Sequence, residues 1–398
     1  MNALSRKTDI TKRVLAALSA VSILFLPDYS DGNPYQSNLA AALDEEVTYG
    51  HEVSSVPVLR ALIEDDISLV HVHWLNLFFK GDSTAGTALK FGLLLVRLLA
   101  IRLAGIPVVW TVHNVTMHEA EHPWLERRFK RWFITSGTCD RLILHCEAVE
   151  ERLFEELDLP ESARNQIDVV PHGHYLDNYE NDISRCEARA SFDIGDSETV
   201  FLFFGMIRRY KGVLDLIDTY RGATVPNSRL LVAGKPATER LRSELRQRAG
   251  DDDRIRGVYE FVPDDEIQRY MAAADAVVLP YRDITTSGSA VLAMSFGKSL
   301  VVPPLGCLPE LLDEDGTVFY DPDDPDGLRG ALERAPDRDL TAMGAYNERT
   351  VRQYDWAWIG QLTQTTYAKA RGEKPEEMDG RASEKRAELV SGPGQRDL

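Results

Sequence analysis

The chain has 398 residues, of which 44% are hydrophobic and 9% aromatic, so it is a globular protein long enough for two domains. Acidic residues number 63 against 45 lysines and arginines, which gives a formal net charge of −18 at pH 7. This balance excludes general nucleic-acid binding, which requires a basic surface. It is typical of a protein from a high-salt cytoplasm, where screening weakens self-repulsion, and we expect a halophilic source.

The sequence pattern of the amino-terminal end is similar to that of a secretion signal. Four cations before residue 14 precede an uncharged run over residues 14–27. No small-residue cleavage site follows, and the apolar Ile23–Leu26 stops at Pro27, as a short buried strand would. We therefore predict a first strand there, whereas a role of residues 1–20 as an anchor stays open. No uncharged run is long enough to cross a bilayer.

Short apolar runs alternate with helical patterns along the chain and form two series. The first series of expected strands is Ile23–Leu26, Leu69–His73, Val108–His113, Leu142–His145 and Asp168–Pro171. The second is Val200–Phe204, Arg229–Ala233, Arg256–Tyr259, Ala276–Leu279 and Ser299–Val302. Apolar strands separated by helices indicate parallel sheets, so the two series predict an α/β protein with two Rossmann-like domains.

Composition shifts set the expected domain boundaries. We predict an N-terminal domain over residues 1–180, a polar linker over 181–196 and a C-terminal domain over 197–345. A helical pattern in residues 346–370 predicts a terminal helix. Residues 371–398 combine charge and glycine without periodicity, which predicts a disordered tail.

A cluster of cations follows the first strand of the second series. Gly205 comes directly after Val200–Phe204, and Arg208, Arg209 and Lys211 follow within the next six residues. Ligands of open α/β folds bind at the carboxyl ends of the strands, and a helical pattern starts just afterwards, so an anion is favoured here. Arginine binds phosphate in a bidentate manner and lysine as a point charge. The alternative is a set of surface cations paired with nearby acids.

A second loop supports an anion site. It follows the strand Ala276–Leu279, contains the run Thr285–Ser289 and precedes a helical pattern over Ala290–Phe296. Hydroxyls and a glycine at a helix N-terminus form a second place for an anion. A helix N-cap is the alternative, and it explains one serine of the run.

Several motifs together resemble the family 4 glycosyltransferases of the GT-B fold, in a branch typical of bacteria and archaea. They are GxIRxYKG (205–212), PYRxxxTSGS (280–289), LGCLPELL (305–312), NPYQSNLAAAL (33–43), HVHW (71–74) and WTVHN (110–114). The resemblance covers nearly the whole chain to about Ala370, in family order. It implies two Rossmann-like domains facing across a cleft, a C-terminal helix that crosses back to the N-domain, and a hexosyltransferase of class EC 2.4.

The resemblance also implies site residues. Arg208 and Lys211 are expected to grip the donor diphosphate and to act in catalysis. The expected donor-binding residues are Gly205, Arg208, Arg209, Lys211, Val262, Thr286, Ser287, Gly288, Ser289 and Glu310. Two departures stand out: Met206 replaces the usual arginine, and the paired glutamates of the family fall on Ile284 and Leu292. Retention or inversion at the sugar therefore stays open.

The acceptor side is expected in the first half. His113 ends the strand Val108–His113, and histidine suits proton transfer because its pKa lies near neutrality. We predict that His113 is catalytic and that it lies on the acceptor side together with Asn114. Gly32 and Asn33, in the loop after the first strand, are the other predicted acceptor-side residues. A cationic clamp on the diphosphate needs no metal, so we expect no cofactor and no metal. The group His118, Glu119 and His122 is a weak metal alternative.

Two segments of the first half suit an anionic membrane surface. Residues 88–104 are apolar nearly all round, and residues 124–133 interleave four cations with aromatic side chains. The alternative for residues 88–104 is a buried helix, and the alternatives for residues 124–133 are contact with an acidic partner and a solvated face. We expect an enzyme peripheral to the cytoplasmic face of the membrane.

The predicted activity is hexosyl transfer from a UDP- or GDP-sugar to a glycan or a polyprenyl- or dolichyl-linked saccharide, in cell-surface glycan or glycoprotein biosynthesis. A UDP-sugar 2-epimerase of the same fold and a non-catalytic nucleotide-sugar-binding protein are the alternatives. Sugar, nucleotide, acceptor and oligomeric state stay undetermined at this point.

Overall fold

The computed structural model describes residues 22–30, 32–50, 62, 67–75, 84–116 and 123–374. The chain divides into two compact units, and each is described by itself. The first unit runs as far as Pro171 and resumes at Trp356, and the second spans His172–Asp355. Within the described residues, no helix is both long and apolar enough to cross a membrane.

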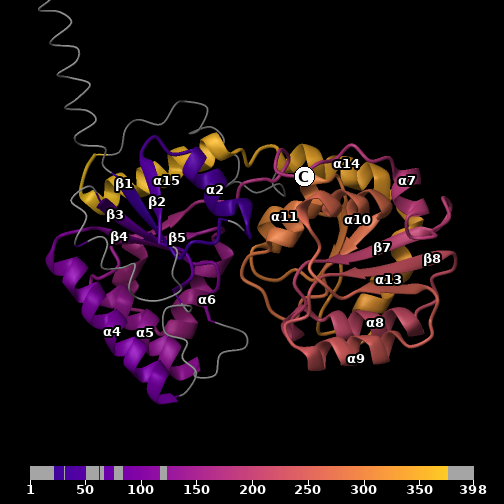
Figure 1. The fold of residues 1–398 in the computed structure, drawn as a ribbon, viewed down its shortest axis with the longest axis horizontal. Helices are drawn as coiled ribbons and strands as arrows, with labels where there is room; N and C mark the ends of the chain where they lie inside the picture. Colours follow the sequence, from indigo (N-terminus) through magenta and orange to yellow (C-terminus); the bar gives the residue numbers. More distant parts are fainter. Residues whose placement is uncertain are drawn as a thin grey trace, which may run out of the picture. The chain divides into compact units, whose positions relative to one another are not determined.

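The first unit is built on a parallel sheet. Its six strands lie in the order β2-β1-β3-β4-β5-β6 (Figure 1). They are β1 (Ser22–Leu26), β2 (Glu46–Tyr49), β3 (Ile67–Val72), β4 (Val108–Thr111), β5 (Arg141–Leu144) and β6 (Ile167–Val169). Every residue of β1 and β4 is buried, as expected for strands covered on both faces. The direction of strand addition reverses between β1 and β3, which creates a switch point at their carboxyl ends.

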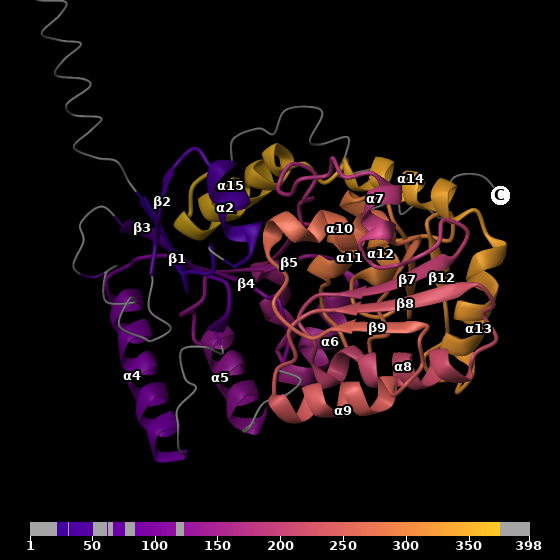
Figure 2. The ribbon, with the colours of Figure 1, turned by 45° about the vertical axis from the view of Figure 1, so that its right-hand side comes forward.

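Helices cover both faces of this sheet. Figures 1 and 2 show α4 (Thr84–Leu103) and α5 (Pro123–Thr135) side by side on one face, and α2 (Pro34–Ala41) with α15 (Trp356–Arg371) on the other. The remaining helices are α6 (Ala148–Leu157) and the 3-10 turn η3 (Glu161–Gln166). The terminal helix α15 packs on α2, β4 and β5, so the predicted return of the C-terminal helix to the N-domain is confirmed.

A buried hydrogen-bond chain fastens α15 to the sheet. The Tyr367 hydroxyl lies 2.7 Å from His71 Nδ1, and His71 Nε2 lies 2.8 Å from the Thr111 hydroxyl. All three side chains are buried, and Thr111 also bonds to the Tyr35 side chain of α2. Both nitrogens of His71 are thus occupied by structural partners.

The second unit contains another six-stranded parallel sheet, in the order β12-β11-β10-β7-β8-β9. Its strands are β7 (Thr199–Phe204), β8 (Ser228–Ala233), β9 (Ile255–Val258), β10 (Ala276–Val278), β11 (Ser299–Val302) and β12 (Thr317–Phe319). The return from β9 to β10 passes over β7, so this sheet has its switch point between β7 and β10.

Helices flank this second sheet (Figures 1 and 2). They are α7 (Arg185–Ala190), α8 (Val213–Gly222), α9 (Glu239–Ala249), α10 (Ile267–Ala273), α11 (Gly288–Ser295), α13 (Gly327–Arg334) and α14 (Leu340–Val351). The short α12 (Leu308–Leu311) follows β11, and the 3-10 turn η4 (Arg209–Lys211) follows β7. The core joins Phe201, Phe203 and Leu216 with residues of α9, α13 and the neighbouring strands.

The predicted α/β class with two Rossmann-like domains is confirmed, and each of the ten predicted strands has a counterpart. The sequence analysis missed β2 and β12, which lie at one edge of each sheet. Residues 181–196, the predicted linker, contain α7, and α7 packs on α10 of the second unit. Of the predicted tail 371–398, residues 375–398 lie outside the described part.

Candidate functional site

Two groups of polar side chains gather at the switch points of the two sheets. In the second unit, Gly205 follows β7, and the loop 279–287 follows β10 next to it. In the first unit, His73 follows β3 and His113 follows β4. Each group thus occupies the edge of a parallel sheet at which ligands of open α/β folds bind.

The second-unit group is called the cationic cradle here and consists of Gly205, Arg208, Lys211 and Ser289. A Cβ atom placed on Gly205 would lie 3.1 Å from Ser289 Oγ and 3.9 Å from Lys211 Nζ, so these three residues converge on one point. Burial, and next the charge of Arg208, lower the pKa of Lys211 to about 8. Two neighbouring cations at the end of a strand disfavour each other until an anion binds between them.

Two glycines allow the loops around the cradle to pack closely against one another. Gly212 has a φ of +69°, and a Cβ there would lie 1.9 Å from the carbonyl oxygen of Pro280. Gly234 follows β8, and a Cβ there would lie 1.8 Å from the carbonyl oxygen of Gly205. Any larger residue at either position would push the loops after β7, β8 and β10 apart.

The helix α11 starts inside the cradle. Ser287 is its N-cap, and its Oγ accepts a hydrogen bond from the Ala290 N–H at 3.1 Å. The buried Tyr281 hydroxyl lies 2.8 Å from Ser287 Oγ and also bonds to Ser289. Burial raises the pKa of Tyr281 to about 12, so its hydroxyl stays neutral. Gly288 is the first residue of the helix, and the N-terminal end of a helix favours negative charge.

The predicted donor residue Arg209 and one further cation at this edge, Arg282, have protein partners. One nitrogen of Arg209 lies 2.8 Å from both carboxylate oxygens of Glu244 on α9. Arg282, in the PYR run, makes a bidentate pair with Asp215 at 2.7 Å through each nitrogen. Its backbone N–H donates to the Tyr210 carbonyl at 2.9 Å, which ties the loop after β10 to the loop after β7.

Three more predicted donor residues lie around the same edge. Thr286 precedes the N-cap of α11, and the neighbouring Thr285 carbonyl accepts from the Cys307 N–H at 2.9 Å. Glu310 lies in the first turn of α12 and is exposed. Val262 is 8% exposed and lies in the loop after β9.

Two residues that were not predicted, His172 and Tyr175, lie near the start of α11. A Cβ on Gly288 would lie 3.5 Å from the Tyr175 hydroxyl and 4.0 Å from His172 Nε2. His172 Nδ1 lies 2.8 Å from the Gly173 carbonyl, so Nδ1 carries the proton and Nε2 is left to accept from Tyr175 at 3.3 Å. The Tyr175 N–H in turn donates to Ser295 Oγ, at 3.0 Å. His172 follows the first sheet in sequence, and no sequence signal linked it to α11.

The first-unit group is called the histidine cluster here and consists of His71, His73, His113 and His145. The ring centroids of His71 and His73 lie 4.1 Å apart, and those of His113 and His145 lie 5.3 Å apart. His113 Nε2 lies 3.4 Å from His73 Nδ1, and the His113 ring stacks on Trp74 at 4.5 Å. Burial lowers the pKa of His71 to about 3 and that of His145 to about 4. Unlike these two, His113 is only half-buried.

Lys130 of α5 holds the loop that carries His113. It is buried together with Glu126, and the two side chains lie 2.6 Å apart. The Lys130 ammonium also donates to the carbonyls of Val115 at 2.7 Å and Asn114 at 3.3 Å. Predicted site residue Asn114 is therefore anchored from the helix below it.

The other predicted acceptor-side residues lie at the start of α2. Asn33 is its N-cap and accepts from the Tyr35 N–H at 3.0 Å, which is the turn-forming role of an Asn-Pro pair. Gly32 precedes it, and a Cβ there would meet no atom of the described residues within 4 Å. The weak metal alternative His118, Glu119 and His122 lies outside the described residues. Elsewhere in the described part, no three His, Cys, Asp or Glu side chains gather as metal ligands.

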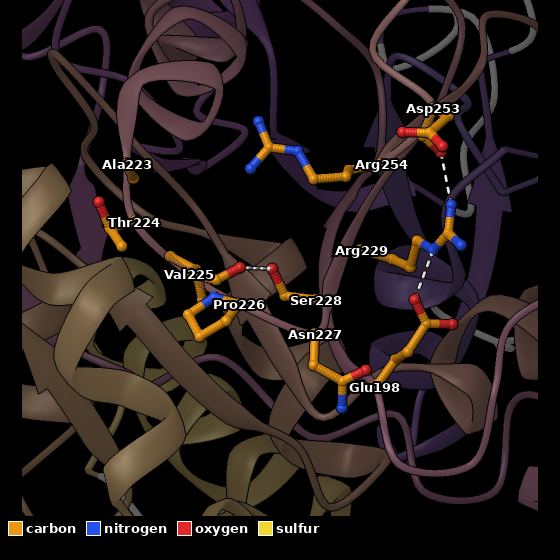
Figure 3. A pocket seen from close by; sticks show the side chains of 10 residues that line it. All are labelled: Glu198, Ala223, Thr224, Val225, Pro226, Asn227, Ser228, Arg229, Asp253 and Arg254. Carbon is orange, nitrogen blue, oxygen red and sulfur yellow. Dashed lines mark hydrogen bonds and ion pairs between the residues drawn. The ribbon is translucent and has the colours of Figure 1, made fainter.

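A hollow at the opposite edge of the second sheet does not belong to this site. Its volume is about 430 Å³, and it lies where β7, β8 and β9 begin (Figure 3). Figure 3 shows Arg229 between Glu198, at 2.7 Å, and the Asp253 carbonyl. Arg254 pairs with Asp252 at 2.8 Å. Because both cations are neutralised, this hollow lacks the charge that the cradle has.

The two segments for which a membrane contact is predicted, 88–104 and 124–133, have buried and exposed sides. On α5, Phe129, Lys130 and Phe133 point into the protein, so they do not form part of an outer face. Trp124 is 63% exposed, and Arg127 and Arg128 are exposed. On α4, the buried residues are Leu94, Leu98 and Ile101, whereas the exposed apolar ones are Leu89, Leu93, Val96, Leu99 and Leu103.

Two family models match the chain. The family described as Glycosyl transferases group 1 matches residues 198–336, and Glycosyltransferase Family 4 matches residues 46–178. A GDP-mannose:glycolipid 4-beta-D-mannosyltransferase of Xanthomonas campestris pv. campestris is 29% identical over 373 residues, which cover 90% of this chain and 95% of that protein. An alpha-maltose-1-phosphate synthase of Mycolicibacterium smegmatis is 25% identical over 68% of this chain and 75% of its own.

Solved structures share the fold. Anabaena HepE, crystallised with UDP and glucose, superposes with a TM-score of 0.67 at 17% identity, covering 88% of this chain and 100% of that one. A glycosyltransferase of Rickettsia africae superposes with a TM-score of 0.65 at 12% identity, covering 88% and 98%. At these identities the likeness shows the fold alone.

Proposed function

We infer that this chain, a glycosyltransferase of the GT-B fold, transfers a hexosyl unit from a nucleotide-diphosphate sugar to a glycan or lipid-linked saccharide acceptor. The observation that carries this assignment is the convergence of Lys211, Gly205 and Ser289 at the switch point of the second sheet. The Xanthomonas relative, whose name gives GDP-mannose as donor and a glycolipid as acceptor, supports the substrate classes.

In the proposed reaction the cradle holds the donor diphosphate. As the glycosidic bond breaks, negative charge grows on the leaving phosphate, and fixed cations and N–H donors stabilise that charge most. Lys211 and Arg208 supply the cations, and the first amides of α11 supply donors beside Ser289. We propose that this clamp works without a metal. Equal transfer rates with EDTA and with added Mg²⁺ are expected, and a strict Mg²⁺ requirement would contradict it.

We propose that His113 serves the acceptor. It ends β4 at the sheet edge, is only half-buried, and lies in a loop held by Lys130. A hydrogen bond from this ring would orient the acceptor hydroxyl for attack on the sugar. The His113→Ala variant is expected to lose transfer and to keep its donor affinity.

A panel of nucleotide-sugars tests the activity against its alternatives. Incubation with UDP-, GDP- and dTDP-hexoses and a polyprenyl-diphosphate saccharide is expected to give a product one hexose larger. Appearance of a C2 epimer of the sugar would favour an epimerase, and binding without turnover of any donor would favour a binding protein. Either result would overturn the transferase assignment.

We further propose that α4 and α5 rest on the cytoplasmic face of the membrane, where a lipid-linked acceptor is found. On α4, Leu89, Val96 and Leu103 are 65%, 64% and 89% exposed and recur at helical spacing, so they form one apolar stripe. The Phe91 ring contacts Phe129 at 5.3 Å, which fixes this helix beside α5. Trp124, Arg127 and Arg128 of α5 add an aromatic and cationic rim.

Flotation with phosphatidylglycerol vesicles tests the membrane contact. The Leu89→Ser/Val96→Ser variant is expected to lose vesicle binding while its melting temperature stays unchanged, because both residues are exposed. Leu62→Ser, at an exposed leucine of the same unit, is the matched control and should bind as the wild type does. If the double variant binds equally well, the stripe is not the contact. In a high-salt cytoplasm the apolar stripe would matter more than the charges, since salt screens them.

A further inference from the structure

One residue of the histidine cluster carries a polar atom that its surroundings leave unsatisfied. His73 is 1% exposed, and its ring packs against Phe25 at 4.8 Å and His71 at 4.1 Å. Its Nε2 atom is buried and has no hydrogen-bond partner among the residues that the structure describes. A buried polar atom without a partner lowers stability, so a purely structural role would be served better by an apolar ring.

The other nitrogen of His73 faces His113. Nδ1 of His73 lies 3.4 Å from Nε2 of His113, the long end of hydrogen-bond range, and one of the two must carry the proton. If His73 accepted, its proton would sit on Nε2 as a buried donor without an acceptor. If His73 donates, Nε2 is left with a bare lone pair, and orphaned acceptors are less rare in proteins than orphaned N–H groups. The second arrangement is therefore favoured.

We propose that His73 is a positioning residue for sugar transfer: its Nδ1–H donates to Nε2 of His113 and keeps the proton of neutral His113 on Nδ1. This inference rests on the proposed function, in which His113 contacts the acceptor. Together with Trp74, which stacks on the other ring at 4.5 Å and 13°, the bond holds His113 in one orientation. A fixed ring presents one defined nitrogen to the acceptor, as positioning requires.

The neighbouring histidine shows what a structural member of the cluster looks like. Both nitrogens of His71 have partners, Tyr367 and Thr111, so neither nitrogen of this ring is left for His113. His73 instead has one nitrogen toward His113 and one toward nothing described. Burial, and then the nearby His71, lower the pKa of His73 well below its usual value, so it remains a neutral donor.

The His73→Phe variant separates positioning from structure. Phenylalanine fills the space between the aromatic rings around His73 and removes the unpaired Nε2 atom. The melting temperature should therefore stay the same or rise. The kcat of transfer should fall about tenfold or more, because His113 loses its anchor, while the donor KM stays unchanged. His73→Asn, whose side-chain amide occupies the place of Nδ1, should recover most of the loss. Unchanged kcat in His73→Phe, or a loss that the asparagine variant does not relieve, would overturn the proposal.

His71→Phe is the matched control. It breaks two buried hydrogen bonds, so its melting temperature should fall, and the kcat of the folded protein should fall much less than in His73→Phe. If His71→Phe lowers kcat as much as His73→Phe does, any disturbance of the cluster suffices and His73 has no special role.

A measurement on the wild-type protein keeps the proposal testable if the variants fail to fold. Long-range ¹⁵N spectra of the full chain, labelled at histidine and recorded above the pKa of free histidine, report the tautomer of each ring. His113 should appear as the Nδ1–H form, and an Nε2–H form would overturn the assignment. The outcome is distinct from failure of the proposed function. Full transfer by His113→Ala would remove the acceptor role itself, whereas lost transfer there with intact His73→Phe removes the His73 inference alone.

Discussion

Each unit contains a lysine that is shielded from water: Lys130 is buried and Lys211 is half-buried, and the two lysines differ in their partners. Lys130 of the first unit lies 2.6 Å from the Glu126 carboxylate and donates to two carbonyls. Lys211 of the second unit has Arg208 nearby, and within the described residues it forms no ion pair with an acid. A buried cation that its own chain satisfies is structural. We propose that one beside another cation, such as Lys211, is completed by an anion from outside.

Removal of the cation from the buried Lys130–Glu126 pair should have the largest effect on stability. The Lys130→Met variant leaves the Glu126 carboxylate buried without its cation and frees the His113 loop. We expect the free energy of unfolding, measured in urea, to fall by about 3–5 kcal/mol. The control is Lys130→Met/Glu126→Leu, which removes both charges and should regain most of the loss. A loss below about 1 kcal/mol in the single variant would mean that the pair behaves as an exposed one.

The same substitution at Lys211 should lower activity without lowering stability. Lys211→Met removes a desolvated charge that has a cationic neighbour, so the ligand-free protein should melt at the same temperature or higher. The kcat of transfer should fall by about 10²–10³-fold, the loss typical of removing one donor to a developing charge. Arg240→Met, at an exposed cation on α9, is the control and should change neither quantity. Retained turnover in Lys211→Met would refute the donor site.

The pKa of Lys211 predicts a smaller effect that depends on pH. Because burial lowers it to about 8, free enzyme loses this charge as pH rises through 8, and kcat/KM for the donor should fall there. The stability of the ligand-free protein should move the other way. Between about 8 and the ordinary 10.5, the unfolded chain binds more protons than the folded one, so stability rises with pH.

The Lys211→Arg variant sharpens this test, since arginine stays charged throughout the range. Its alkaline decline in kcat/KM should be absent. If wild type and Lys211→Arg decline in parallel between pH 7 and 9, another group is responsible.

Much of this arrangement could be predicted from the sequence, because its signals are local. Ten apolar runs located ten strands, and a glycine after Val200–Phe204 located the sheet edge. The edge strand β2 was missed because its residues are exposed or half-buried, so its apolar signal is weak. The sequence also could not show which of the neighbouring Arg208 and Arg209 pairs with an acid, since the partner of Arg209 is Glu244, 35 residues away.

The helix α5 illustrates the same limit within one element. Its composition suggested a basic outer face, but its rotation brings Lys130, Phe129 and Phe133 inward. The four-residue spacing of Glu126 and Lys130 was an available hint of an internal pair. His172 could not be found this way, because its proximity to α11 arises only when residue 172 and residue 288 meet in the fold.

Calorimetric titration of UDP and GDP into three proteins tests the central claim most directly. Wild type should bind one of the two nucleotides, His113→Ala should bind it with the same affinity, and Lys211→Met should show at least a tenfold weaker affinity, about 1.4 kcal/mol. Such a result would place the diphosphate in the cradle of the second unit. Weakened binding in His113→Ala together with unchanged binding in Lys211→Met would contradict the account.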